Sequence, residues 1–217
     1  VINTPINTRP NFVYSLPSNV APNTFITANY FVYEGIGHRV LLPASTLYAS
    51  LVTKMSQNLN EFAPVYNRGI MPVSPIEKVY SEQERLMLLR NRINSLKIFE
   101  NQWCFNNNLT VEQNTIFKEE NIKRLANAIA KHLKRILKTF IGQQNNKATR
   151  EKVAVKVRNM LKRVIDIHSY HPESYLIIVD ETNNRDYSNY LYVDIAVKMP
   201  MSAKYIKLVS VAQLIQP

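Results

Sequence analysis

Apolar residues recur three and four positions apart between residues 117 and 141, with polar residues between them. This spacing predicts an amphipathic helix over about 117–141, followed by Gly142 in the position that often ends a helix. A second helix is predicted to begin at Thr149 as its N-cap. The apolar positions are Ile122, Leu125, Ala126, Ile129, Leu133, Ile136, Leu137 and Phe140 in the first helix, and Val153, Val157, Met160, Leu161 and Val164 in the second.

Beyond residue 168 the pattern changes to the alternation and short apolar runs that are typical of β-strands. Strands are predicted at 175–179, 190–197 and 205–215, with an Asn- and Asp-rich turn between the first two. Two helices followed by three strands form an α+β unit over about 115–217. A sheet of two or three short strands leaves backbone groups unpaired at its edges, so we expect a strand from elsewhere in this chain or from a neighbouring molecule to complete it.

The first 80 residues hold most of the prolines, and short β-like runs such as 29–33 and 38–42 lie between them. This composition predicts loop-rich β structure, followed by a helix over 82–96 and a short strand or loop at 103–108. The predicted fold class is therefore α+β. A small mixed sheet is packed by two long amphipathic helices, and a loop-rich β/α segment precedes it.

Composition excludes several classes of protein. The length of 217 residues is typical of one large domain or two small ones, and no apolar run is long enough to cross a membrane. Only 4 glycines are present, and none forms the glycine-rich loop that binds nucleotide phosphates. The single Cys104 cannot form an intrachain disulfide or a Cys-rich zinc site. We therefore expect neither a membrane protein, nor a disulfide-stabilised secreted module, nor a nucleotide-binding enzyme.

The net charge of +11 is concentrated in one quarter of the chain. Residues 117–168 contain 14 basic and 4 acidic residues, a net charge of +10. A solvated helical face is the ordinary explanation of such a pattern, but this excess favours binding to nucleic-acid phosphates or to an acidic protein surface. The second helix has no aromatic residues that would stack on bases, which favours the protein surface. The candidate binding residues are Lys152, Lys156, Arg158, Lys162 and Arg163.

No set of residues predicts catalysis. His168 and His171 are close in sequence but have no further metal ligand nearby, so a polar loop is the better interpretation. Cys104 lies between two aromatic residues, which favours a buried apolar role over a nucleophile. Asp180 and Asp186 fall in the Asn-rich turn, where solvated carboxylates are expected. We expect no enzymatic activity, no metal and no cofactor.

Several short segments occur in an informative order. A Pro/Ser turn and an Ala-rich helix at 42–51 are followed by an Ala-Pro segment at 61–69. Later segments are Arg92-Ile93-Asn94, a strand at 103–110, Ile122-Lys123-Arg124-Leu125, then Phe140, Asn145, Asn146, Thr149 and Leu161, and finally Ile206-Lys207-Leu208. This order resembles that of contractile phage tail sheath proteins over about residues 30–215. Ser50 and Ser56 stand where the family usually has Gly and an acidic residue, which points to a distant branch such as that of a giant phage.

The resemblance implies a structural subunit that polymerises as stacked rings around an inner tube and contracts to drive the tube through the host envelope. The implied partners are other copies of the chain, an acidic inner tube protein, and the baseplate and tail terminator at the ends. The implied location is the virion tail, with assembly in the host cytoplasm. The alternative is a basic nucleic-acid-binding protein that uses the helices of 117–168.

The resemblance also implies a division of the chain. Residues 1–80 continue from the sheath core, residues 81–204 form the conserved C-terminal domain, and residues 205–217 form an arm. The arm is expected to pair with a neighbouring subunit by β-augmentation. Its pairing residues are Tyr205, Ile206, Lys207, Leu208, Val209 and Val211. The five candidate cations are expected to face the tube.

Overall fold

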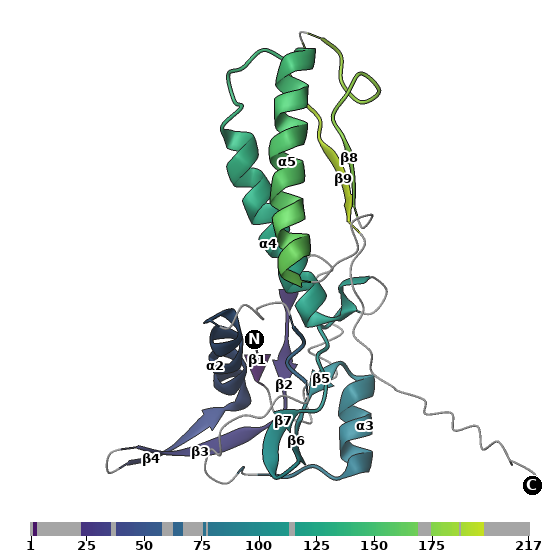
Figure 1. Cartoon of the computed structure of the whole chain (residues 1–217). Helices are drawn as coiled ribbons and strands as arrows, with labels where there is room; N and C mark the ends of the chain where they lie inside the picture. The colour runs from purple at the N-terminus through teal and green to yellow at the C-terminus, as the bar shows by residue number, and fades with distance from the viewer. Residues whose placement is uncertain are drawn as a thin grey trace, which may run out of the picture.

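The computed structural model describes residues 2–3, 23–35, 38–57, 63–66, 76, 78–112, 116–168, 175–186 and 188–197. Figure 1 shows an elongated molecule in two parts. The wider part, called the base, contains the described residues up to 112. The narrower part, called the helical unit, contains the described residues from 116 to 197.

A three-stranded parallel sheet joins distant parts of the base. It consists of β1 (Ile2–Asn3), β2 (Ile26–Thr27) and β5 (Ile93–Asn94) in that order. The buried side chain of Asn94 donates to the carbonyl oxygens of Ile26 and Leu109 at 3.0 and 2.8 Å, and it accepts from the Leu109 N–H at 2.9 Å. A carboxamide can satisfy three backbone groups in this way, which holds the short sheet together. The sheet thus includes strands from both sides of the predicted boundary at residue 80.

Two hairpins and a helix surround the larger apolar core of the base. The hairpins are β3 (Tyr30–Gly35) with β4 (His38–Pro43), and β6 (Leu96–Phe99) with β7 (Gln102–Phe105). The turn between β6 and β7 has positive φ angles of 49° and 59° at its two residues, as tight hairpin turns require. Helix α2 (Ala44–Gln57) follows β4 directly. The core contains Phe25, Phe31, Ala44, Leu47, Leu51, Met55, Val65, Ile76, Leu96 and Phe105.

The helix predicted over 82–96 is shorter than expected. Helix α3 (Glu82–Arg90) begins at a capping box in which Ser81 and Glu84 hydrogen-bond to each other's backbone. It ends because Arg92 adopts a left-handed conformation with φ 58°, after which the chain enters β5. The periodic pattern did not reveal this break, since the apolar residues of the following strands continue the helical spacing by chance.

The helical unit confirms both predicted helices. A short 3-10 turn, η2 (Ile116–Lys118), leads into α4 (Glu120–Lys138), and α5 (Lys147–His168) packs beside it. An antiparallel hairpin of β8 (Tyr175–Ile178) and β9 (Asp194–Val197) covers one side of the helix pair (Figure 1). The core of the helical unit contains Leu125, Ile129, Val153, Val157, Leu161 and Val179.

The ends of both helices differ from the prediction. Helix α4 is capped by Thr139, so Gly142, with φ +86°, lies in the turn after the cap. The Asn146 side chain accepts the Thr149 N–H at 2.9 Å, so Asn146 has the N-cap role that was predicted for Thr149. Both Asn and Thr are good capping residues, and only the three-dimensional turn decides between them.

The α+β class is confirmed. The base combines short strands with α2 and α3, in agreement with a β/α segment that precedes the helix pair. The described part of the sheet beside α4 and α5 is a two-stranded antiparallel hairpin. Strand β8 matches the predicted strand 175–179, and β9 covers the second half of 190–197. The predicted strand 205–215 lies outside the described residues.

Candidate functional site

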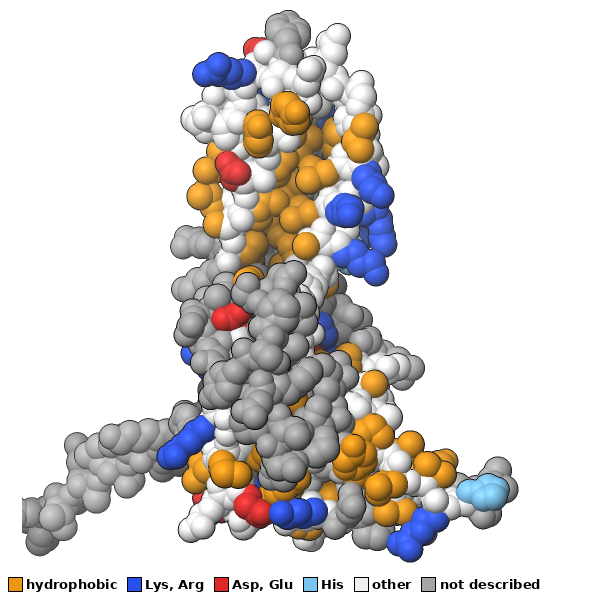
Figure 2. All heavy atoms as spheres, turned by 180° about the vertical axis from the view of Figure 1, so that it is seen from behind, with side chains coloured by type: hydrophobic (Ala, Val, Ile, Leu, Met, Phe, Trp, Pro, Cys, Tyr) orange, Lys and Arg blue, Asp and Glu red, His pale blue; other side chains and the backbone are white. Residues whose placement is uncertain are grey.

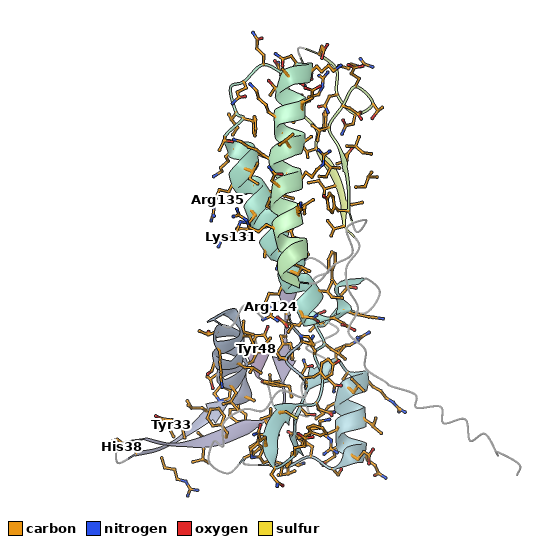
Figure 3. The ribbon with its side chains drawn as sticks, viewed as in Figure 1. Tyr33, His38, Tyr48, Arg124, Lys131 and Arg135 are labelled. Carbon is orange, nitrogen blue, oxygen red and sulfur yellow. The ribbon has the colours of Figure 1, made fainter. Side chains whose placement is uncertain are left out.

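Helix α4 carries a basic face opposite its apolar face. With about 100° of rotation per residue, Lys131, Lys134, Arg135 and Lys138 fall within about 100° of one another. All four side chains are exposed. Figure 3 shows Lys131 and Arg135 on the outer side of α4, away from α5, and Figure 2 shows basic side chains gathered along one edge of the helical unit. These four residues, called the α4 basic face, present their charges in one direction.

The five cations predicted on α5 are also exposed, but they form two groups. By the same geometry, Lys152, Lys156 and Arg163 form one ridge, and Arg158 and Lys162 form another about 120° away. The buried residues Val153, Val157 and Leu161 lie between the ridges on the inner side of the helix. A flat partner touches one side of a helix, so it contacts one α5 ridge more fully than the other.

The α4 basic face is not among the candidate residues predicted from the sequence. Its four cations contribute to the predicted charge of 117–168, but the five candidate binding residues all lie on α5. The available signal was their spacing, because positions 131, 134, 135 and 138 repeat at the helical period and lie out of phase with the apolar positions.

A second surface of the helical unit is apolar. A cleft of about 760 Å³ is lined by side chains of α4, of the turn after it, and of the segment that leads into β9. Its apolar lining includes Leu133, Leu137, Phe140 and Ile141, of which Ile141 is 80% exposed. Lys134 and Lys138 of the α4 basic face line its edge, so the two surfaces adjoin. Figure 2 shows this apolar surface between the two edges of the helical unit. Exposed apolar surface of this kind marks a place where another polypeptide segment can pack.

The loop between β8 and β9 is anchored to α5 by a buried arginine. Arg150 is 2% exposed, and its Nη1 lies 2.6 Å from Oδ1 of Asp186, whose side chain is 56% exposed. The same guanidinium donates to Asn145 Oδ1 at 3.2 Å, and the Asn145 amide donates to the Tyr190 carbonyl oxygen at 2.7 Å. This network fixes the hairpin against the N-terminal turn of α5.

The side chain of Asn184 stabilises the same loop by hydrogen bonds to the backbone. The Asn184 amide donates to the Tyr192 carbonyl oxygen at 2.9 Å and accepts the Tyr192 N–H at 2.7 Å, as a strand partner would.

The carboxylates of this loop are solvated. Hydrogen bonds from Thr182 lower the pKa of the exposed Asp180 carboxyl. The prediction of solvated carboxylates is confirmed for Asp180 and Asp186, although Asp186 also serves the buried Arg150.

A polar cluster lies where the helical unit joins the base. The Tyr48 hydroxyl of α2 donates to Oε1 of Glu120, in the first turn of α4. Arg124 lies 3.1 Å from the same oxygen, and its Nη2 donates to the Ala63 carbonyl oxygen at 2.9 Å. Burial raises the pKa of Glu120, an effect that Arg124 and Tyr48 oppose. Figure 3 shows Tyr48 and Arg124 at this junction, which the cluster ties together.

The other predictions from the sequence concern Cys104, metal binding and membrane crossing. Cys104 is 1% exposed, which confirms its buried apolar role. No group of three His, Cys, Asp or Glu residues among those described is arranged to hold a metal ion. No described helix combines the length and the apolar run that a membrane crossing needs. The side chain of His168, the residue His171 and the predicted arm at 205–217 lie outside the residues that the structure describes.

Comparisons with known proteins identify the fold. No protein family model matches the sequence, and no curated protein matches it. The helical sheath of the anti-feeding prophage in its contracted state aligns with a TM-score of 0.78 and 16% identity, over 90% of this chain and 58% of that one. The sheath complex of the extracellular contractile injection system PVC, also contracted, aligns with a TM-score of 0.80 and 14% identity, over 96% and 60%.

A more distant match is the sheath tail protein from Desulfitobacterium hafniense. It aligns with a TM-score of 0.54 and 13% identity, over 76% of this chain and 41% of that one. The chain therefore has the fold found in these contractile sheath proteins. It spans about 58 to 60% of the length of the anti-feeding prophage and PVC proteins.

Proposed function

We propose that this chain is part of a structural subunit of a contractile tail sheath. The observation that carries the proposal is the similarity to two sheath proteins over 90% and 96% of the chain, at TM-scores of 0.78 and 0.80. The order of short segments in the sequence independently supports it. Copies of the subunit stack as rings around an inner tube, and contraction drives the tube through the host envelope. The subunit belongs to the virion tail, is assembled in the host cytoplasm, and meets the baseplate and the tail terminator at the ends.

The hairpin of β8 and β9 is the proposed acceptor of a neighbour's strand. A two-stranded sheet is marginally stable alone, and an added strand pairs its open backbone groups. The proposed donor is the arm at 205–217, with the pairing residues Tyr205, Ile206, Lys207, Leu208, Val209 and Val211. The apolar cleft beside the hairpin supports this proposal, because an incoming segment with large apolar side chains would cover it. Residues 81–204 form the domain that receives the arm.

Basic residues of the helical unit are the proposed contact with an acidic inner tube. The α4 basic face supports this contact, because its four cations point in one direction, and the α5 ridge of Lys152, Lys156 and Arg163 is the competing candidate. Arg158 and Lys162 lie on the other α5 ridge. Exposed ion pairs contribute only about 0–1 kcal/mol each, so a subunit can release the tube while many subunits together hold it.

Electron microscopy and immunoblotting of the native particle test the proposed function. Striated tubes are identified in negative stain, purified, and dissociated in denaturant, so that residues proposed to face the inner tube become accessible. Recognition of the major tube-forming protein by an antibody against residues 117–168 supports the sheath proposal. Striated tubes whose dissociated major protein is not recognised, by an antibody that does recognise the purified chain, contradict it.

The α4 basic face also favours one alternative function, binding to nucleic acid. Four aligned cations neutralise phosphates, and the affinity would then fall steeply with salt concentration. Filter binding with duplex DNA at increasing salt measures this dependence. Tight binding with a steep salt slope, together with striated tubes whose dissociated protein the antibody does not recognise, would replace the sheath proposal.

A further inference from the structure

The hairpin of β3 and β4 projects from the base with apolar residues exposed. Phe31, where the hairpin leaves the base, is 3% exposed, but Tyr33 is 51% exposed only two residues later. Its cross-strand partner Val40 is 45% exposed, and Leu41, on the opposite face of the hairpin, is 50% exposed. Figure 1 shows that the outer half of the hairpin extends away from the other elements of the base. Apolar side chains on both faces of a projecting hairpin favour association.

A second exposed apolar surface lies on the opposite side of the base. Leu86 and Met87 of α3 are 51% and 52% exposed, and Val79, just before this helix, is 56% exposed. In Figure 1 the hairpin and α3 are on opposite sides of the base at the same level along the molecule. The two surfaces therefore cannot cover each other within one copy of the chain.

We propose that the β3–β4 hairpin of one copy packs on α3 of the next copy at the same level. The choice of a second copy as the partner rests on the proposed function, in which identical subunits form rings. A contact between different surfaces on opposite sides of identical molecules repeats from copy to copy and closes into a ring or continues as a helix. Methionine and leucine on α3 form an adaptable apolar surface that suits the tyrosine and valine of the hairpin.

Opposite charges stand near the rims of the two surfaces. Arg39, near the tip of the hairpin, and Glu82, at the start of α3, are both exposed. Opposite charges at the rims favour a contact between the two different surfaces over a contact between two copies of either one.

Cysteine crosslinking of the full chain tests the contact. Val40→Cys and Leu86→Cys are prepared separately, mixed in equal amounts under assembly conditions, and treated with a flexible bis-maleimide. Cys104 is buried and can stay in place. The mixture is expected to give a covalent dimer on a denaturing gel, and each variant alone is expected to remain monomeric. A chain that carries both substitutions is expected to give a ladder of oligomers.

The matched control is Val40→Cys mixed with Val155→Cys, because Val155 is 49% exposed but lies on α5. This mixture is expected to give no dimer. Crosslinking of Val40→Cys with itself would overturn the proposal in favour of a two-fold contact. Striated tubes without crosslinks would overturn this contact and leave the sheath function intact, whereas a crosslinked ladder without tubes would support the contact and contradict the sheath.

Discussion

Asp186→Asn is expected to destabilise the helical unit by about 1–3 kcal/mol. The substitution leaves Arg150, which is 2% exposed, without the carboxylate that lies 2.6 Å from its Nη1. The contact to Asn145 Oδ1 at 3.2 Å remains, but it is neutral and longer. Breaking a fully buried ion pair costs about 3–5 kcal/mol. Because the side chain of Asp186 is 56% exposed, water screens part of the attraction and lowers the expected cost.

The double variant Arg150→Met and Asp186→Asn distinguishes an unpaired buried charge from a general loss of packing. Methionine fills a similar volume without a charge, so the double variant is expected to be more stable than Asp186→Asn alone. The free energy of unfolding is measured by urea titration, followed by far-UV circular dichroism. In a chain of this size a loss of 1 kcal/mol lowers the melting temperature by about 2–4 °C.

Glu181→Gln is the matched control, since Glu181 is an exposed carboxylate of the same turn. This control is expected to change the free energy of unfolding by less than about 0.5 kcal/mol. The role of Asp186 as the partner of a buried charge is refuted if Asp186→Asn costs no more than Glu181→Gln. It is equally refuted if the double variant is less stable than Asp186→Asn, because the buried charge would then not be the cause.

Three further predictions concern charge, assembly and pH. Reversal of the α4 basic face by Lys131→Glu, Arg135→Glu and Lys138→Glu is expected to abolish co-sedimentation with purified tubes at low salt. If this α4 variant still binds, and a variant with the α5 ridge reversed to Glu does not, the contact belongs to α5. Deletion of the chain from Ile206 onward is expected to leave the helix content unchanged by circular dichroism but to prevent polymerisation, and polymers of normal length in the electron microscope would disprove strand exchange. Burial raises the pKa of Glu120 above its ordinary value. As the pH falls from neutral, the folded protein therefore binds a proton at Glu120 before the unfolded chain does. Over that range the protonation of Glu120 increases the free energy of unfolding, so the folded state becomes more stable. Glu120→Gln is expected to remove this part of the pH dependence of the urea midpoint, and an unchanged profile would contradict the assignment.

Local patterns determined the main elements of this protein. The spacing of Ile122, Leu125 and Ile129 identified α4, because a helix repeats its inward positions every three or four residues. The runs at 38–42 and 175–179 identified β4 and β8 for the corresponding reason in strands. The aromatic neighbours of Cys104 identified its burial, and the charge count identified the helical unit as the basic part. These properties depend on residues that are close in sequence.

Only the tertiary structure decided how distant residues combine. Ile26 pairs with Ile93, and Tyr48 bonds to Glu120, across separations that no local pattern encodes. The burial of Arg150 follows from the loop that folds over it, since its sequence position resembles that of its exposed basic neighbours. The division of the α5 cations into two ridges follows from which side of the helix packs inward. The order of short segments already pointed to the sheath family. Because many sequences can satisfy one set of packing contacts, only the three-dimensional comparison established the shared fold, where 14 to 16% of residues are identical.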